Sequence, residues 1–335
     1  MAKSWFTACV GLALIGLWTV VSPAGAQSIP ELSPSRVLEL PRQGVPDKSP
    51  VISSLAIDPA GKQLAAVGDD HLVRLWDPRT ANLLHTLASH TGWVRVAAFR
   101  PDGKVLATAG DDRQIRFWDA SSGNLVRTLP EGQHALYALA YSADGRMLAA
   151  GGFGDKVRVY DADDGRLLRE LDAPASDIRA VTFSPDATRV AAAGRTGVIR
   201  IWDAASGKQV ADLEGGRRLI HALRWSPDGA LLAAAGQRRT IRLWDTASNK
   251  PQADLPGQPG SVLALEFCGS GRLAAGTTAN TIHVWDLGSR QELYRLAGHT
   301  GSVATLVWNA GSGQLLSGGF DCTIRTWHLK KEDIQ

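Results

Sequence analysis

An aromatic residue followed by aspartate recurs along this chain at an almost constant spacing of 42 residues. The pairs, the last with histidine in place of aspartate, are Trp76-Asp77, Trp118-Asp119, Tyr160-Asp161, Trp202-Asp203, Trp244-Asp245, Trp285-Asp286 and Trp327-His328. Self-similarity at a fixed period of this length is typical of folds in which each repeat is one supersecondary unit stacked on its neighbours. The chain is therefore expected to contain seven copies of one structural unit.

Each unit consists of short, β-rich runs separated by turn residues. In the second unit the runs are Val94–Phe99, Val105–Ala109, Gln114–Trp118 and Leu125–Leu129. The turns between them contain Asp102-Gly103, Asp111-Asp112 and Ser122-Gly123. Asp-Gly and Ser-Gly between alternating runs are typical of β-hairpins. Four antiparallel strands per unit are therefore predicted.

The sizes of the side chains indicate how the units are arranged. The second runs are nearly all small, as in Leu64-Ala65-Ala66, Leu148-Ala149-Ala150 and Leu232-Ala233-Ala234, whereas the third runs end in a large aromatic. Sheets that pack radially need small side chains where neighbours crowd near the axis, because only these allow a close approach. Seven such sheets in a ring leave only short, protected edges.

With these residues the chain resembles the WD-repeat β-propellers, over about residues 36–329. The resemblance implies an all-β fold, a seven-bladed β-propeller of four-stranded antiparallel blades. After Trp327 only eight residues remain, too few and too charged for a fourth strand, whereas Val37-Leu38-Glu39-Leu40 matches the fourth runs of other units. We predict that this N-terminal strand, at about residues 36–40, completes the last blade and closes the ring, as is usual in the family. It would also cover an edge that could otherwise pair with another chain.

Residues 1–26 have the pattern of a signal peptide. Lys3 precedes the apolar stretch Trp5–Val21, and Ala24-Gly25-Ala26 is a small-residue cleavage pattern. We expect cleavage and export to a periplasmic or secreted location, with no membrane attachment afterwards and one propeller domain over residues 27–335; an uncleaved anchor is the alternative. Cys268 and Cys322 fall in turns expected on opposite faces, so no disulfide between them is predicted.

The charges and histidines do not indicate a nucleic-acid, metal or cofactor site. The chain has 36 Lys and Arg against 33 Asp and Glu, a net charge of +3 without a basic run. A nucleic-acid partner is therefore not expected. The sequence has no CxxC motif and no histidines at metal-ligand spacing, so we predict no metal and no cofactor. His283 replaces an arginine that recurs in the third runs, and we expect it to be a solvated or packing residue.

Two sets of side chains could be read as hydrolase triads. They are His90, Thr108 and Asp112 in the second unit, and His299, Ser317 and Asp321 in the seventh. Both lie at matching offsets from Trp118 and Trp327. The resemblance assigns them to structural tetrads, in which the aspartate accepts from histidine, histidine bonds the hydroxyl and the hydroxyl bonds the indole. We predict no catalytic residue, and we expect blades without a full tetrad to rely on apolar packing.

The resemblance also indicates where a partner would bind. In this family the loops between second and third strands and the loops between blades share one face, here called the loop face. The residues expected to contact a partner there are Asp69, Asp111, Phe153, Arg195, Gln237 and Phe320, together with Trp93, Arg217, Arg218 and Arg238. Aspartates on blades one and two and arginines on blades four and five would give this face two halves of opposite charge.

These features favour an exported, non-enzymatic scaffold, expected to be a monomer, that binds a protein or peptide on its loop face. The alternatives are a propeller enzyme, either a hydrolase or a quinone-type oxidoreductase, and an accessory subunit of an exported redox complex. An enzyme would need a convergent charged cluster or a metal at the central funnel. The strands next to the funnel are mostly Ala, Val and Leu, which favours the scaffold. Fold alone does not identify the partner.

Overall fold

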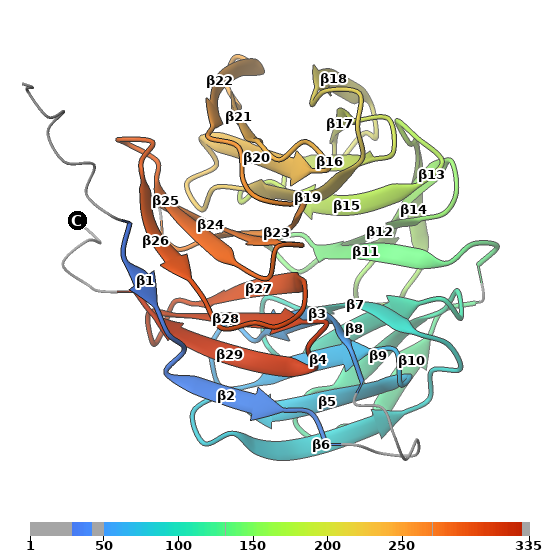
Figure 1. The fold of residues 1–335 in the computed structure, drawn as a ribbon. Helices are drawn as coiled ribbons and strands as arrows, with labels where there is room; N and C mark the ends of the chain where they lie inside the picture. The colour runs from blue at the N-terminus through green and yellow to red at the C-terminus, as the bar shows by residue number, and fades with distance from the viewer. Residues whose placement is uncertain (1–28, 42–49, 131, 270, 330–335) are drawn as a thin grey trace, which may run out of the picture.

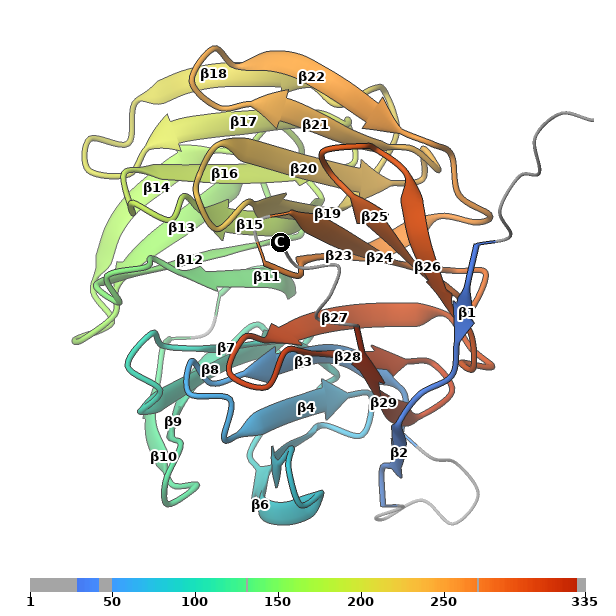
Figure 2. The same cartoon turned by 90° about the vertical axis from the view of Figure 1, so that its left-hand side faces the viewer.

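The computed structural model describes residues 29–41, 50–130, 132–269 and 271–329, and every regular element in these ranges is a β-strand. The strands form seven sheets that follow one another around a ring (Figures 1 and 2). The first strands of neighbouring blades contact each other all the way round, and the last contact, β27 against β3, completes the circle. The predicted seven-bladed, all-β propeller is confirmed.

The strands are named here by their place in each blade. The first strands of blades one to seven are β3 (Ile52–Ile57), β7 (Val94–Phe99), β11 (Leu136–Tyr141), β15 (Ile178–Phe183), β19 (Ile220–Trp225), β23 (Val262–Phe267) and β27 (Val303–Asn309). The second strands are β4 (Leu64–Gly68), β8 (Val105–Gly110), β12 (Met147–Gly152), β16 (Arg189–Gly194), β20 (Leu231–Gly236), β24 (Arg272–Thr277) and β28 (Gln314–Gly319).

The outer two strands of each blade follow in the same order. The third strands are β5 (Leu72–Asp77), β9 (Ile115–Asp119), β13 (Lys156–Asp161), β17 (Val198–Asp203), β21 (Ile241–Asp245), β25 (Ile282–Asp286) and β29 (Thr323–His328). The fourth strands of blades one to six are β6 (Asn82–Ala88), β10 (Leu125–Thr128), β14 (Leu167–Asp172), β18 (Gln209–Glu214), β22 (Lys250–Leu255) and β26 (Glu292–Leu296). Consecutive strands within a blade pair antiparallel.

The last blade is completed from the other end of the chain. Its outer strand is β2 (Arg36–Glu39), which pairs antiparallel with β29 from Arg36 opposite Thr326 to Glu39 opposite Thr323. Just beyond β2, Leu40 is buried beside Ile324 and Ile52, in a cluster shared by blades seven and one. The predicted closure by an N-terminal strand is confirmed.

A second N-terminal strand was not predicted. Residues Glu31–Leu32 form β1, which pairs in parallel with β26 at the outer edge of blade six (Figure 2). The backbone N–H of Arg295 donates to the Pro30 carbonyl at 3.0 Å, and that of Ala297 donates to the Leu32 carbonyl at 3.1 Å. One short N-terminal segment thus joins two neighbouring blades.

The alanine-rich second strands lie between the blades. In blade four, Ala191, Ala192 and Ala193 are all fully buried, and Ala191 and Ala193 pack in one cluster with Leu223 and Trp244 of blade five. A larger side chain in these strands would push neighbouring sheets apart, because protein interiors are already close-packed.

Several sequence expectations fall on residues outside the described ranges. These are the leader, most of the loop between Pro41 and Pro50, and the charged tail after Leu329. Cys268 follows β23, whereas Cys322 lies in the β28–β29 turn, so the two cysteines are at opposite ends of their blades as expected. In the part of the chain that is described, no helix is present that could cross a bilayer.

We expect the N-terminal strand pairing to be required for stability. Deleting residues 27–41 removes both β1 and β2, and it should lower the free energy of unfolding by more than any single substitution there. Leu40→Ala should cost about 2–5 kcal/mol, the usual range for a buried leucine. Val37→Ala, on the exposed face of β2, should change it by less than about 1 kcal/mol. Urea unfolding of the three variants checks this, and an unchanged transition for the deletion would contradict it.

Candidate binding site at the mouth of the central cavity

All seven first strands carry a β-bulge at the same place. In blade two the register with β8 shifts between Val94 and Val96, and the bulged residue is Arg95. The equivalent bulged residues are Ser53, Arg95, Tyr137, Arg179, His221, Leu263 and Ala304. A bulge turns a side chain away from the direction that strand alternation gives it. All seven line one cavity of about 350 Å³ on the axis of the ring.

The glycines that end the second strands allow this local geometry. At Gly110, a β-carbon would lie 2.0 Å from the carbonyl oxygen of Trp93, the residue before β7. A side chain at Gly110 would clash with this carbonyl, and glycine ends the second strand in six of the seven blades, whereas blade six has Thr277 there.

The lining of the cavity differs between its two sides. Blades two to five contribute the large polar or aromatic side chains Arg95, Tyr137, Arg179 and His221, whereas blades six, seven and one contribute Leu263, Ala304 and Ser53. Further along the first strands the lining is mainly apolar, with Leu55, Leu139, Val181, Leu265 and Leu306, but it also includes Ser54, Thr305 and Arg224. A volume of this size is at the low end for ligand pockets. It therefore suits one or two inserted side chains.

An alternating set of aromatic and arginine side chains crosses the mouth of the cavity, and we call it the aromatic–arginine stack. The Cζ of Arg95 lies 3.6 Å from the ring centroid of Trp93 and 5.0 Å from that of Tyr137. The Cζ of Arg179 lies 4.1 Å from Tyr137 and 5.1 Å from Phe153. Phe153 meets Tyr137 edge to face at 5.0 Å. Such cation–π contacts are each worth about 0.5–2 kcal/mol.

Two carboxylates hold the arginines of the stack in place. Asp111 accepts two hydrogen bonds from Arg95, at 2.9 Å from Nε and 2.7 Å from Nη2. Asp177, which is 2% exposed, pairs with Nε of Arg179 at 2.6 Å and with Nη2 of Arg195 at 3.0 Å. Because a planar guanidinium bound at two points has few rotamers left, the stack is ordered before any partner binds.

His221 follows the stack around the mouth, on blade five. Burial lowers the pKa of its imidazole, and the positive charge of Arg179 lowers it further, against an opposing effect of Asp177. The imidazole is therefore neutral near pH 7, when it can both donate and accept a hydrogen bond.

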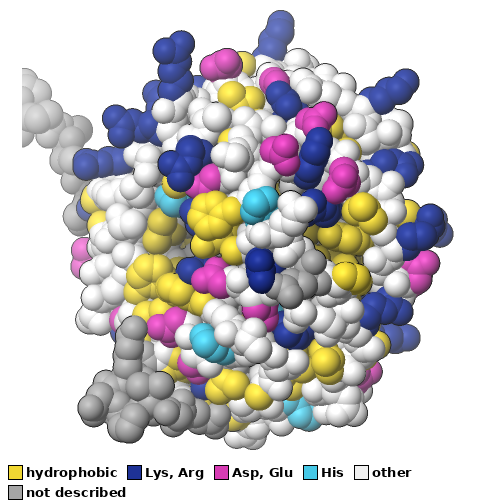
Figure 3. All heavy atoms as spheres, turned by 90° about the vertical axis from the view of Figure 1, so that its right-hand side faces the viewer, with side chains coloured by type: hydrophobic (Ala, Val, Ile, Leu, Met, Phe, Trp, Pro, Cys, Tyr) yellow, Lys and Arg dark blue, Asp and Glu magenta, His cyan; other side chains and the backbone are white. Residues whose placement is uncertain are grey.

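The structure brings some of the expected partner-binding residues together at this mouth. Trp93 is half-buried under Arg95, whereas Phe153 and Phe320 are 37% and 47% exposed. Hydrophobic side chains gather near the centre of the face in Figure 3, and Lys and Arg gather towards the top, where Figure 1 places blades four and five. Asp69 is turned inwards, where its Oδ1 accepts from the backbone N–H of Val51 at 2.9 Å. The exposed residues away from the cavity are Arg217, Arg218, Gln237 and Arg238.

The expectation of two oppositely charged halves is wrong on the acidic side. Asp70 pairs with Arg74 at 2.6 Å, Asp111 pairs with Arg95, and Asp112 belongs to a buried network. The aspartates Asp70, Asp111 and Asp112 are therefore satisfied within the protein, whereas the arginines of the loops of blades four and five are exposed.

Four residues of the site were not identified from the sequence. Arg95, Tyr137, Arg179 and His221 lie in strands that were expected to present mostly Ala, Val and Leu to the funnel. The signal that could have found them is a fourth register at the 42-residue spacing, at the second residue of each first strand. Large polar or aromatic residues occupy this register in four consecutive blades.

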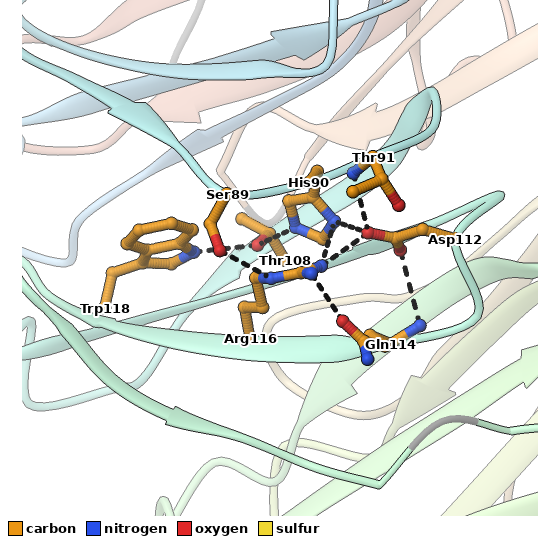
Figure 4. Close-up of polar contacts among 8 residues, drawn as sticks. All are labelled: Ser89, His90, Thr91, Thr108, Asp112, Gln114, Arg116 and Trp118. Atoms are coloured by element: carbon orange, nitrogen blue, oxygen red, sulfur yellow. Dashed lines mark hydrogen bonds and ion pairs between the residues drawn. The ribbon is translucent and has the colours of Figure 1, made fainter.

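Blade two contains a complete tetrad (Figure 4). His90 Nδ1 lies 2.7 Å from Asp112 Oδ2, and His90 Nε2 lies 2.8 Å from Thr108 Oγ1. The Trp118 indole N–H donates to the same hydroxyl at 2.8 Å. The indole can only donate and the carboxylate can only accept, so the chain runs from Trp118 through Thr108 and a neutral His90 to Asp112.

Blade seven repeats this network. His299 Nδ1 lies 2.8 Å from Asp321 Oδ2, and its Nε2 lies 2.7 Å from Ser317 Oγ. The Trp327 indole N–H donates to Ser317 at 2.8 Å, and the backbone N–H of Thr300 donates to Asp321 at 3.0 Å. Both predicted sets of four residues are thus connected as the resemblance implied.

The pKa values of the buried tetrad side chains are shifted in the directions that these contacts require. Burial would raise the pKa of Asp112, but the hydrogen bonds and charges of His90 and Arg116 outweigh it and hold that pKa well below its usual range. The pKa of Asp321 is depressed in the same way, by His299 and the N–H of Thr300. For His90, burial lowers the pKa by more than its hydrogen bond to Asp112 raises it.

Blades three to five replace the tetrad with ion pairs between the third and fourth strands, which corrects the expectation of apolar packing alone. The pairs are Arg158–Glu170 at 2.8 Å, Arg200–Asp212 at 2.7 Å and Arg242–Asp254 at 2.8 Å. In blade six, His283 is buried, lies 2.6 Å from Glu292 and stacks on Trp285, so it is a packing residue rather than a solvated one. Ion pairs near the surface are individually weak.

The hydroxyls of the two tetrads are not accessible to a substrate. Thr108 and Ser317 are both 0% exposed, and each already receives the indole N–H and donates to histidine. A nucleophile must reach the reacting carbon at about 3 Å, which these positions do not allow. Within the described ranges, no group of three or more His, Cys, Asp or Glu side chains could hold a metal ion.

Breaking one tetrad should destabilise the propeller. Ser317→Ala leaves the buried Trp327 N–H and the His299 Nε2 without a partner, and it should cost about 1–3 kcal/mol of unfolding free energy. Ser312→Ala, an exposed serine of the same blade, should change it by no more than about 0.5 kcal/mol. Chemical denaturation compares the two, and equal midpoints would contradict the role given to Ser317.

The tetrad histidine should also make stability depend on pH. Because the folded pKa of His90 is below its ordinary value of 6.5, the unfolded chain takes up a proton first, and stability falls as pH drops below about 6.5. Asp112 and Asp321 have depressed folded pKa values, so their contribution is lost below about pH 4. His90→Gln should flatten the loss between pH 7 and pH 5. Parallel stability curves for wild type and variant in that window would overturn this.

The repeats match a known family model along almost the whole propeller. The model described as WD domain, G-beta repeat matches seven segments, which are residues 42–77, 81–119, 123–161, 165–203, 207–245, 249–286 and 290–328. A curated relative, the probable serine/threonine-protein kinase PkwA of Thermomonospora curvata, is 34% identical over 74 residues. That match spans 22% of this chain and 9% of the kinase, and the activity in the name is that of the kinase. With seven matched repeats, the chain belongs to the WD-repeat family.

Proposed function

We propose that this chain is an exported, non-catalytic binding module that holds a protein or peptide partner on its loop face, across the mouth of the central cavity. WD-repeat propellers generally mediate protein–protein interactions. The observation that carries the proposal for this chain is the aromatic–arginine stack, which joins Trp93, Arg95, Tyr137, Arg179 and Phe153 at the rim of a partly apolar cavity.

The composition and order of the stack both favour binding. Trp, Tyr and Arg are the residue types that dominate binding energy at protein interfaces. Here they are fixed by Asp111 and Asp177 before a partner arrives, so little side-chain entropy is lost on binding. Phe153 and Phe320 add exposed aromatic surface next to the cavity, and exposed apolar surface of this kind is typical of an interaction site.

The non-catalytic part of the proposal is supported by the closed state of both tetrads. Each hydroxyl that resembles a nucleophile is buried and fully engaged, and each histidine has both ring nitrogens occupied. The signal-peptide pattern of residues 1–26 supports export.

A capture experiment with a matched control tests the proposal. The mature wild-type protein, the variant Phe153→Ala/Phe320→Ala and the control Val126→Ala/Val210→Ala are used as bait in the native exported fraction. Val126 and Val210 are about as exposed as the two phenylalanines but lie on the outer strands β10 and β18. All three baits must first show the same unfolding midpoint.

We expect one protein to be captured by wild type and control and lost with the loop-face variant, and its purified form to bind directly with the same order of affinities. Capture that is equal for all three baits would place the interaction elsewhere. A chromophore or stoichiometric metal that copurifies with the wild-type protein would favour a propeller enzyme or a subunit of an exported redox complex instead.

A further inference from the structure

Five exposed arginines come from three successive loops on the loop face, and we call them the basic sector. Arg195 lies in the β16–β17 turn of blade four, Arg217 and Arg218 lie in the β18–β19 loop, and Arg238 and Arg239 lie in the β20–β21 turn of blade five. The sector borders the cavity, because Arg195 shares Asp177 with Arg179 of the aromatic–arginine stack.

The three loops of the basic sector are in contact with one another. A β-carbon on Gly197 would lie 2.7 Å from the Arg218 carbonyl oxygen, and one on Gly216 would lie 2.2 Å from the guanidinium of Arg238. Both glycines have positive φ, at +75° and +92°. The side chain of Arg238 therefore lies across the β18–β19 loop, and the arginines form one continuous surface rather than scattered charges.

Most of the positive charge of this surface is not neutralised within the described structure, although Arg195 pairs with Asp177. Arg217, Arg218, Arg238 and Arg239 form no ion pair with any residue in the described ranges. The neighbouring carboxylates Asp177, Asp212 and Asp254 are held by Arg179, Arg200 and Arg242, which leaves Glu214 at the end of β18 as the remaining nearby acidic group. On blades one and two, by contrast, Asp70, Asp111 and Asp112 are paired internally.

The tetrad register explains how blade five can present Arg238 on this face. In blades two and seven the register positions hold His90 with Asp112 and His299 with Asp321, and these four side chains are used internally. In blade five the same positions hold Gly216 and Arg238. Without a histidine to bond, Arg238 extends over Gly216 and lines a small pocket together with Arg218. Arg238 thus occupies the position of a tetrad aspartate and adds its charge to the basic sector.

We propose that the partner binds this face through an acidic peptide segment that lies across the basic sector and inserts an apolar side chain into the central cavity. This inference rests on the proposed function and specifies its partner. Guanidinium groups bind carboxylates at two points, which gives orientation as well as affinity. The near-neutral aspartate side of the face and the apolar lining of the cavity fit a peptide, because a nucleic acid would require a longer basic track than five residues on one side.

Selection from a library of displayed random peptides of about 12 residues, long enough to span about 40 Å when extended, tests this without knowledge of the partner. Wild type is compared with Arg217→Glu/Arg218→Glu/Arg238→Glu. The matched control is Lys104→Glu/Arg146→Glu/Lys208→Glu, which makes the same change in charge in turns at the opposite end of the blades. All three proteins are first shown to unfold at the same midpoint.

We expect wild type and control to select peptides rich in Asp and Glu next to an aromatic or aliphatic residue. The Kd of a synthesised peptide from this set should rise at least about tenfold on the charge-reversed sector and stay unchanged on the control. Replacing its acidic residues with Asn and Gln should cause a similar loss on wild type, and binding should weaken with salt.

The other outcomes separate the two proposals. Neutral peptides that bind the charge-reversed protein normally but fail on Phe153→Ala/Phe320→Ala would overturn the acidic segment and leave the proposed function standing. Peptides that bind all variants alike would overturn both. If no peptide is selected, or if an oligothymidine displaces the acidic peptide with higher affinity, the inference is overturned.

Discussion

The pairing of β2 with β29 is the interaction on which the rest of this ring depends. Each blade is a sheet that packs on its two neighbours, so the first and last blades can be buried on both sides only if the circle closes. The closing strand comes from the other end of the chain, and Leu40, the residue that follows it, packs between blades seven and one. Contacts that are distant in sequence therefore hold a structure whose other contacts are mostly local, and β1 extends the same tie to blade six.

The polar networks are not spread evenly around the ring. Complete tetrads occur in blades seven and two, and in blade one between them Arg74 still pairs with Asp70. Blade one shows what an incomplete tetrad costs, because the buried indole N–H of Trp76 has no hydrogen-bond partner in the described structure. Blades three to five use strand-to-strand ion pairs instead, which are nearer to the surface and weaker. The loops of blades three to five therefore do not have to supply the histidine and aspartate of a tetrad.

Most of the fold can be predicted from the sequence because the fold is periodic. The 42-residue register predicts the blades and the match of the N-terminal strand to the fourth strands, and the resemblance to WD-repeat propellers predicts both tetrads. The stack at the cavity was not predicted, because the side-chain direction of Arg95, Tyr137 and Arg179 depends on a bulge that strand alternation does not reveal. The acidic half of the loop face was wrongly predicted for a similar reason. The sequence shows that Asp111 is acidic, but it does not show that Arg95 neutralises it.

The β-bulge of the first strands connects the packing of the ring with the proposed binding site. A bulge at the start of every first strand brings one side chain per blade to the axis, so a cavity lining of seven positions can change without altering how the blades pack. Arginine and aromatic residues occupy these positions only in blades two to five, beside the loops of blades four and five that carry the unpaired arginines. The aromatic–arginine stack and the basic sector therefore lie on one side of the loop face. A partner that uses both can bind in only one orientation, because rotation by one blade would separate its acidic segment from the basic sector.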